Sequence, residues 1–141
     1  MRVKEMICVT AGVAGSFIAR LFGGWDSALV TLVIFMIADY ISGLIVAGVF
    51  HKSKKSENGA LESKAGWKGL CKKGMTMLFV LIAHRLDLAL GLDFIRNTVI
   101  IGFMANELIS IVENAGLMGL PLPAVLSKAI DILAQKADVE E

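Results

Sequence analysis

The chain of 141 residues is as long as one domain, and 56% of its residues are hydrophobic, with a mean hydropathy of +0.72. The apolar residues are concentrated in long runs with few charges, which argues against a water-soluble fold and for lipid as the solvent. The formal net charge is only +1, so the overall charge indicates no class of partner.

The first apolar segment, residues 6–22, is short and is interrupted by polar residues and by Arg20. A spanning helix needs about 20 predominantly apolar residues. We therefore expect a helix that either crosses the membrane or lies along its surface. Arg2 and Lys4 precede the segment as in a signal peptide, but no A-x-A cleavage pattern follows, so we expect it to be retained.

Residues 27–50 form the most apolar segment, and Asp39 is their one charged residue. At about 1.5 Å rise per residue, a helix of this length would extend roughly 36 Å and cross the hydrocarbon core with some tilt. We expect a transmembrane helix here.

Asp39, Gly43 and Ala47 follow at intervals of four, so they share one stripe of this helix. A carboxylate near mid-membrane costs about 2.5–3.5 kcal/mol, so it should not face lipid. Small residues at this spacing let another helix approach closely. The stripe therefore predicts a helix contact whose acid either pairs with a base, such as Arg85 or Arg96, or faces water.

Residues 51–74 are hydrophilic and are expected to form a loop. Seven lysines minus two glutamates give this segment a local charge of +5. The lysines are Lys52, Lys54, Lys55, Lys64, Lys68, Lys72 and Lys73. Short lysine-rich loops between spans stay in the cytoplasm, so these residues predict the orientation of the chain. The segment has no arginine and only Trp67 as an aromatic residue, which argues against a nucleic-acid-binding surface.

Two further apolar segments, residues 75–92 and 94–112, are close enough to form a hairpin of transmembrane helices. On the first of them, Asp87 shares a stripe with Thr76 and Ala83. The second carries a polar stripe at spacings of three, four and seven, made of Asn106, Glu107, Ser110, Glu113 and Asn114. That stripe marks either the emergence of the helix among head groups or the lining of an aqueous path.

Pro121 and Pro123 then interrupt the helical pattern. Residues 123–137 are amphipathic and are expected to lie on the membrane surface or to pack on a neighbour. Residues 1–141 thus predict a single all-α membrane domain, an integral helical bundle with three or four transmembrane helices and a C-terminal amphipathic helix. Two expected spans, residues 75–92 and 94–112, follow the segment 51–74. A cytoplasmic location of that segment therefore implies a cytoplasmic C-terminus.

Signals of an enzyme, a metal site or a cofactor are absent from the sequence. Residues 69–76 resemble a phosphate-binding loop, but Met75 stands where its lysine should be and no strand precedes. Cys8 and Cys71 lie far apart without CxxC spacing, and no ligand-spaced residues accompany the histidines. We expect no catalytic residue, no metal, no cofactor and two reduced thiols.

Several motifs occur in a fixed order along the chain. They are LFGGWD at residues 21–26, DYISG at 39–43, GWKG at 66–69 with the lysines at 72–73, and NELISIVEN at 106–114 running to GLPLP at 119–123. Together they resemble the toxin secretion/phage lysis holin family, which includes holins of phages of Gram-positive bacteria and the clostridial toxin-release holin. The resemblance covers about residues 21–133.

The resemblance implies a multi-pass protein of the bacterial host's cytoplasmic membrane that forms homo-oligomers. At a set time such a protein permeabilises the membrane, which releases an endolysin for host lysis or a large toxin. The resemblance implies no direct contact between the protein and the endolysin or toxin. The resemblance brings no catalytic residues with it. Under this interpretation, the polar stripes lie at helix contacts or along the lesion.

Two alternatives stay open at this point. A small ion channel or transporter subunit could use intramembrane carboxylates such as Asp39 and Glu107 to relay protons. An antiholin-like regulator could share nearly the whole sequence of a holin and delay lysis instead of causing it.

Overall fold

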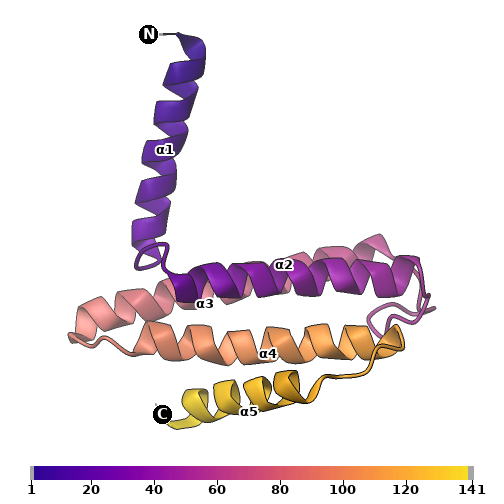
Figure 1. Ribbon diagram of the computed structural model, residues 1–141. Coiled ribbons are helices and arrows are strands. Elements are labelled where there is room, and N and C mark those ends of the chain that lie inside the picture. Colours follow the sequence, from indigo (N-terminus) through magenta and orange to yellow (C-terminus); the bar gives the residue numbers. More distant parts are fainter. Residues whose placement is uncertain (1, 140–141) are drawn as a thin grey trace.

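The computed structural model describes residues 2–139, which form five α-helices. They are α1 (Val3–Leu21), α2 (Ser27–Gly48), α3 (Ser63–Leu90), α4 (Ile95–Leu117) and α5 (Ala124–Val139). Helices α2, α3 and α4 lie side by side along a common direction, α5 packs outside α4, and α1 points away across that direction (Figure 1). The expected all-α fold is confirmed for this part of the chain.

The start of α3 differs from the sequence-based expectation. Residues 63–74, expected to belong to the loop, form the first turns of the helix, so the connection after α2 covers only residues 49–62. The lysines, alanine and leucine of this stretch are good helix formers, and their polarity indicates exposure to water rather than a loop. Helix α4 also continues past the expected end at 112, to Leu117.

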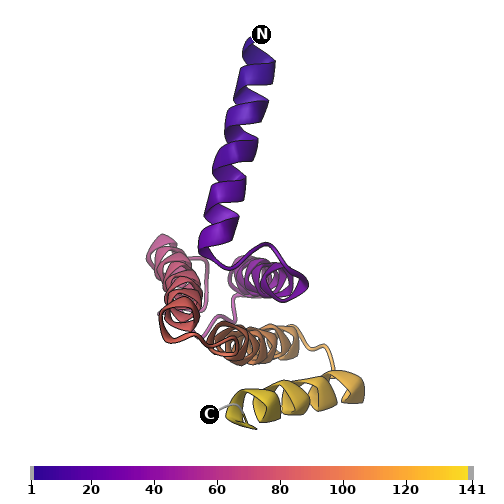
Figure 2. The same cartoon turned by 90° about the vertical axis from the view of Figure 1, so that its left-hand side faces the viewer.

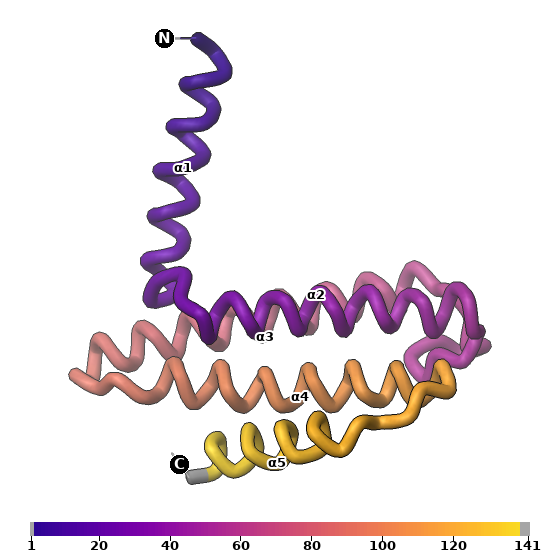
Figure 3. The backbone as a smooth tube through the Cα atoms, viewed as in Figure 1, coloured from indigo at the N-terminus to yellow at the C-terminus, as the bar shows by residue number. Residues whose placement is uncertain are grey.

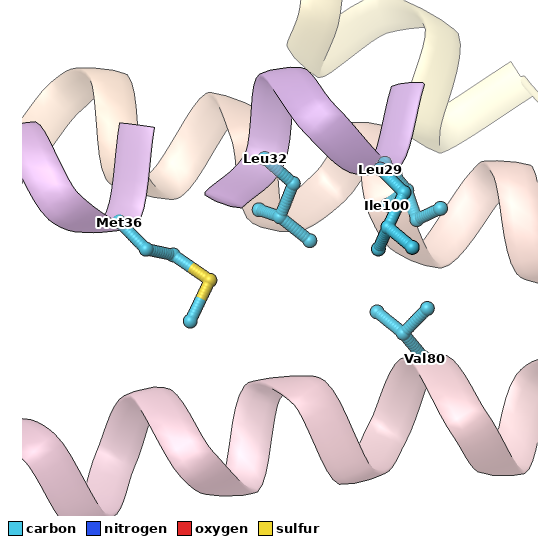
Figure 4. Close-up of a cluster of buried hydrophobic side chains, with 5 residues drawn as sticks. All are labelled: Leu29, Leu32, Met36, Val80 and Ile100. Carbon is cyan, nitrogen blue, oxygen red and sulfur yellow. The ribbon is translucent and has the colours of Figure 1, made fainter. Parts of the chain in front are cut away.

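The interior of the bundle is a small apolar cluster. Leu29 of α2 and Ile100 of α4 lie opposite Val80 of α3, and Leu32 and Met36 of α2 also point toward α3 (Figure 4). Viewed from its end, the bundle has α2, α3 and α4 at the corners of a triangle, with α5 outside α4 (Figure 2). Many of the outward side chains of the bundle are large and apolar, which suits a lipid environment better than water.

Helices α2 and α4 are, within the described residues, the two that are long and apolar enough to cross a membrane. Their mean hydropathies are 2.3 and 1.4 over the most apolar stretch. They correspond to the segments expected at 27–50 and 94–112. Helix α3 has 28 residues and runs beside both, but Lys73, Arg85 and Asp87 make it more polar.

Helix α1 has no core of its own. None of its residues is buried, and large apolar side chains such as Val3, Ile7, Val13 and Phe17 are more than half exposed. The smooth backbone trace shows that a tight turn joins it to the bundle (Figure 3), and the helix approaches α3 near that turn. Its surface is that of a helix made for contact with lipid or with another apolar helix.

Helix α5 packs its apolar side on α4. Ala129, Ile130 and Leu133 are half-buried, and Ala137 lies against Gly102, where a Cβ would be 3.8 Å from the alanine. Of the two expected locations for the amphipathic segment, the membrane surface and a neighbour, the structure shows it on a neighbouring helix of the same chain.

Candidate functional site

Three charged side chains, one from each helix of the bundle, meet in its interior. Lys73 Nζ of α3 donates to Asp39 Oδ2 of α2 at 2.7 Å and to Glu107 Oε2 of α4 at 2.8 Å. The two carboxylate side chains are only 7% and 8% exposed, and the lysine side chain is 14% exposed. We call these three residues the charged triad.

Neutral side chains complete the hydrogen bonding of Asp39. Ser110 Oγ donates to Asp39 Oδ1 at 2.6 Å, and Asn114 Nδ2 donates to the same oxygen at 3.2 Å. Asn114 Nδ2 also donates to Ser42 Oγ at 2.8 Å, and Ser42 Oγ donates to the backbone oxygen of Asp39 at 3.0 Å. Both carboxylate oxygens of Asp39 are therefore paired, which is the condition under which a buried charge is tolerated.

The charged triad joins all three helices through one cation. With both carboxylates ionised, one positive charge faces two negative charges, so the site carries an excess of one negative charge. Polar groups hidden in this way face each other while the helices are packed. If the helices separate, the same groups need water, because an unpaired charge in hydrocarbon is costly.

A second set of polar contacts lies at the turn between α1 and α2. Arg96, at the start of α4, donates from Nη1 to Asp26 Oδ2 at 2.8 Å and from Nη2 to Asp26 Oδ1 at 3.1 Å. Its Nε donates to the backbone oxygen of Phe22, and Nη2 also donates to that of Gly24 at 3.1 Å. One guanidinium thus binds the whole turn, and we call this set the arginine hub.

Two aspartates cap helices at the arginine hub. Asp26 accepts from Leu29 N at 3.0 Å and caps α2, and the hydrogen-bonded Arg96 guanidinium holds the pKa of the Asp26 carboxyl below its usual range. Asp87, near the end of α3, accepts from the backbone amides of Ile95 and Arg96, both at 2.9 Å, and so caps α4. The turn also needs Gly23, because its φ is +87° and a Cβ there would lie 2.7 Å from Arg96 Nε.

The comparisons with known proteins agree with this membrane-type architecture. A sequence model described as the bacteriophage holin family matches residues 16–135. The chain belongs to the bacteriophage holin family. Membership makes it a non-enzymatic helical membrane protein of the cytoplasmic membrane, in agreement with the resemblance seen in its motifs.

Relatives of this holin-family protein occur in Gram-positive bacteria and in a phage. A Listeria innocua protein of uncharacterised function is 43% identical over 128 residues, which cover 90% of this chain and 86% of the relative. A Clostridium perfringens protein, also uncharacterised, is 34% identical over 139 residues, 96% of this chain and 97% of the relative. A probable holin of Bacillus phage phi105 is 27% identical over 108 residues, 76% of this chain and 74% of the relative. No solved structure matches.

The structure separates the candidate residues on α4 into two groups. Glu107, Ser110 and Asn114 point into the bundle and contact Asp39 or Lys73, whereas Asn106 and Glu113 are exposed. The polar stripe expected along this helix is therefore two surfaces, one of which holds the helices together in the packed holin-family bundle.

The candidates on the other helices lie at helix contacts. On α2, Asp39 and Ala47 are buried, and Gly43 faces Asn114, whose Nδ2 would lie 3.8 Å from an added Cβ. On α3, Asp87 is buried in its capping role with Thr76 and Ala83 on the same face. Whether any of these residues lines a pore stays a prediction.

The prediction that Arg85 or Arg96 pairs with Asp39 is wrong, because Lys73 is its partner. Neither Arg85 nor Arg96 reaches it, because Arg85 is exposed and Arg96 is held in the arginine hub. Lys73 had been assigned to the loop as a topology-determining lysine. Its spacing contained the missing signal, since residues 73, 76, 80, 83 and 87 follow at alternating intervals of three and four. The lysine thus extends the buried stripe of α3 by one turn.

The GWKG motif has a packing role that sequence reasoning missed. The ring of Tyr40 lies over the backbone of α3 at Gly66 and Gly69, where added Cβ atoms would be 3.3 and 3.6 Å from the tyrosine. Tyr40 Oη donates to the backbone oxygen of Gly66 at 3.4 Å. Small residues here let α2 and the beginning of α3 come close together.

Proposed function

We propose that this protein oligomerises in the cytoplasmic membrane of a bacterial host and permeabilises it. The lesion would let an endolysin reach the cell wall or a large toxin leave the cell. The charged triad is the observation on which the proposal rests most, because it stores wettable groups inside an otherwise apolar bundle. Family membership and the similarity to a probable phage holin support the same conclusion.

The arrangement of the helices supports a three-span topology. Helix α3 runs beside α2 and α4 and is bound to both through Lys73, so it crosses the membrane with them. The lysine-rich connection and the beginning of α3 then lie on the cytoplasmic side. Helix α1 points across the direction of the bundle, so it lies along the outer surface of the membrane rather than forming a fourth span.

Helix α5 supplies a reason for the bundles to associate. Its exposed face carries Lys128, Asp131 and Gln135, while its other face packs on α4 as far along as Gly102. A single bundle surrounded by lipid would expose these polar groups to hydrocarbon. Several bundles that assemble around water would hydrate them.

The triad gives the assembly two states. In the packed bundle, the carboxylates of the triad face Lys73, and the side-chain amide of Asn114 donates to Asp39. In an assembly that has rearranged around water, the same groups contact water and need no protein partner. Membrane permeabilisation then follows from the exchange of helix contacts for hydration, without any chemical reaction.

Inducible expression in a bacterium tests this function. We expect an abrupt collapse of the membrane potential, and lysis of the culture when an endolysin without its own export signal is co-expressed. Cells that keep their potential at high membrane levels of the protein would show that it does not permeabilise. Variants of Lys73 in the charged triad can be tested in the same assay. Lys64→Met, which changes an exposed lysine of α3, the helix that carries Lys73, is their control.

The bridging of two carboxylates by Lys73 also suits a small ion channel or transporter subunit. That function predicts selective and saturable flux of small ions, which Asp39→Asn abolishes without loss of assembly. A holin instead releases large cargo. An antiholin-like regulator would cause no leakage alone and would delay lysis when it is co-expressed.

A further inference from the structure

A groove of about 450 Å³ opens between the second half of α2, the beginning of α3 and the connection after α2. Leu44, Ala47 and Ala65 give it apolar walls. The triad residues Asp39, Lys73 and Glu107 also line it. The groove therefore joins an apolar surface to a strongly polar one.

The lysines of the basic segment divide into two sets at this groove. Lys55, Lys68 and Lys72 line it together with Lys73, whereas Lys52, Lys54 and Lys64 do not. Lys68 and Lys72 are one turn apart on α3 and so share one face of the helix. The groove thus gathers part of the positive charge that the sequence spreads over residues 51–74.

Lysines outnumber carboxylates in the groove, and among the described residues only Lys73 of these lysines is in an ion pair. Asp39 and Glu107 both accept from Lys73, and Glu62 Oε2 accepts from the backbone amide of Glu57 at 3.4 Å. Within residues 2–139, Lys55, Lys68 and Lys72 form no ion pair. Four lysines and three carboxylates thus line the groove, which gives it a formal charge of +1 and leaves Lys55, Lys68 and Lys72 outside any ion pair of the described residues.

Ser56 adds a second observation. Its hydroxyl oxygen is, among the described residues, the one buried side-chain polar atom that lacks a hydrogen-bond partner, and Ser56 lines the same groove. Buried hydroxyls are normally paired, so the wall of the groove at Ser56 is not fully satisfied in its polar contacts.

The groove lies at the level of the membrane interface in the three-span topology. Trp67, which is 69% exposed, lies about 9 Å along α3 from Lys73 on the side of the connection. Exposed tryptophans are typical of the lipid head-group region. Basic pockets between transmembrane helices on the cytoplasmic side bind anionic head groups.

We propose that this groove binds the phosphate group of an anionic phospholipid. Lys55, Lys68 and Lys72 would hold the phosphate oxygens, and Leu44 and Ala47 would contact the first carbons of an acyl chain. The inference rests on the membrane location of the protein and not on permeabilisation, so either proposal can fail without the other.

Lipid binding by the purified full-length protein tests the site. The protein is placed in nanodiscs of phosphatidylcholine with a small fraction of phosphatidylglycerol, and retained lipid is identified by native mass spectrometry. The variant K68Q/K72Q removes two lysines of the groove, and K52Q/K54Q removes two lysines outside it, so the pair is matched in charge. Far-UV circular dichroism checks that both variants keep their helices.

We expect the wild-type protein and K52Q/K54Q to retain phosphatidylglycerol, and K68Q/K72Q to retain at least tenfold less. Equal loss in both variants would mean that general surface charge attracts the lipid and that the groove is no site. Inorganic phosphate is added as a competitor to separate the two sources of phosphate. If it displaces the lipid at equal concentration, the site takes soluble phosphate and the assignment to a phospholipid is wrong.

Discussion

The charged triad and the arginine hub both tie helices together, but they are built in different ways. Arg96 binds one carboxylate, Asp26, whose side chain is 48% exposed, together with backbone oxygens of a turn and the side-chain oxygen of Asn97. Lys73 binds two carboxylates that are almost fully buried. The ion pair of the hub includes the partly hydrated Asp26, whereas the triad, with both carboxylates ionised, has an excess negative charge inside the bundle.

The difference indicates different roles. A partly hydrated cluster fixes the geometry of a turn, and loss of one contact there can be compensated by water. A buried cluster between apolar helices has no such substitute, so the loss of one of its contacts should destabilise the packed bundle more. The following changes test this comparison, in order of decreasing expected effect.

Lys73→Met should destabilise the bundle most. It leaves two carboxylates close together without a cation, and removing one partner of a buried ion pair costs about 3–5 kcal/mol. The free energy of unfolding in detergent, measured by titration with SDS, should fall by this amount. Lys64→Met, at an exposed position of the same helix, should change it by less than about 0.5 kcal/mol. Equal effects of the two variants would contradict the role of the triad.

Arg96→Met should have a smaller effect, of about 2 kcal/mol, because hydrogen bonds to a charged group are lost but the freed carboxylate of Asp26 is partly hydrated. The same titration measures it. Arg85→Met, which removes an exposed arginine of α3, is the matched control. If Arg96→Met proved more costly than Lys73→Met, the ranking of the two clusters would be reversed.

Asn114→Ala should cost about 1 kcal/mol, since it removes one amide that donates to Asp39 and to Ser42. Its neighbour Glu113 is exposed, and Glu113→Ala should leave the free energy of unfolding nearly unchanged. A larger loss from the Glu113 variant would place the working polar surface of α4 on the outer side of the helix.

The pH dependence of the arginine hub should be the smallest effect. The pKa of Asp26 is lowered in the folded protein, so its contribution to stability is present above the ordinary pKa of an aspartate and is lost as the pH falls through the folded value. The stability difference between wild type and Asp26→Asn should therefore shrink as the pH is lowered from 7 to below about 3. A difference that stays constant over this range would show that ionised Asp26 does not stabilise the fold.

The sequence predicted the helices well because lipid imposes a simple rule on it. The long apolar runs predicted α2 and α4, and Pro121 and Pro123 predicted the break in the helical pattern before α5. The beginning of α3 was missed because hydrophilic residues were taken as a loop. In fact, the polar residues of Ser63–Leu90 form part of a helix that reaches from water into the bundle.

The polar contacts between helices were predicted only in part. The spacing of Asp39, Gly43 and Ala47 puts them on the face of α2 that lies toward the other helices, but it could not name the partner of Asp39, because Lys73, Arg85 and Arg96 are equally basic in sequence. What decides among them is the rotation of α3 and α4 about their axes. That rotation is set by packing between residues far apart in the chain, such as Phe79 against Phe103.

The motifs behind the family resemblance have a common structural explanation. LFGGWD forms the turn that Arg96 binds, DYISG carries Asp39 and Tyr40, GWKG receives the tyrosine ring, and NELISIVEN supplies Glu107, Ser110 and Asn114. Each motif joins one helix to another. The motifs that carry the resemblance thus contribute polar and packing contacts between the helices of this bundle.

The most direct test of permeabilisation uses the purified protein and lipid alone. Vesicles are loaded with both a small fluorescent dye and a folded protein of endolysin size, and full-length protein is reconstituted at increasing density. We predict that the dye and the protein cargo both escape once a threshold density is passed. Retention of both, or escape of the dye alone at every density, would contradict a lesion that passes an endolysin or a toxin.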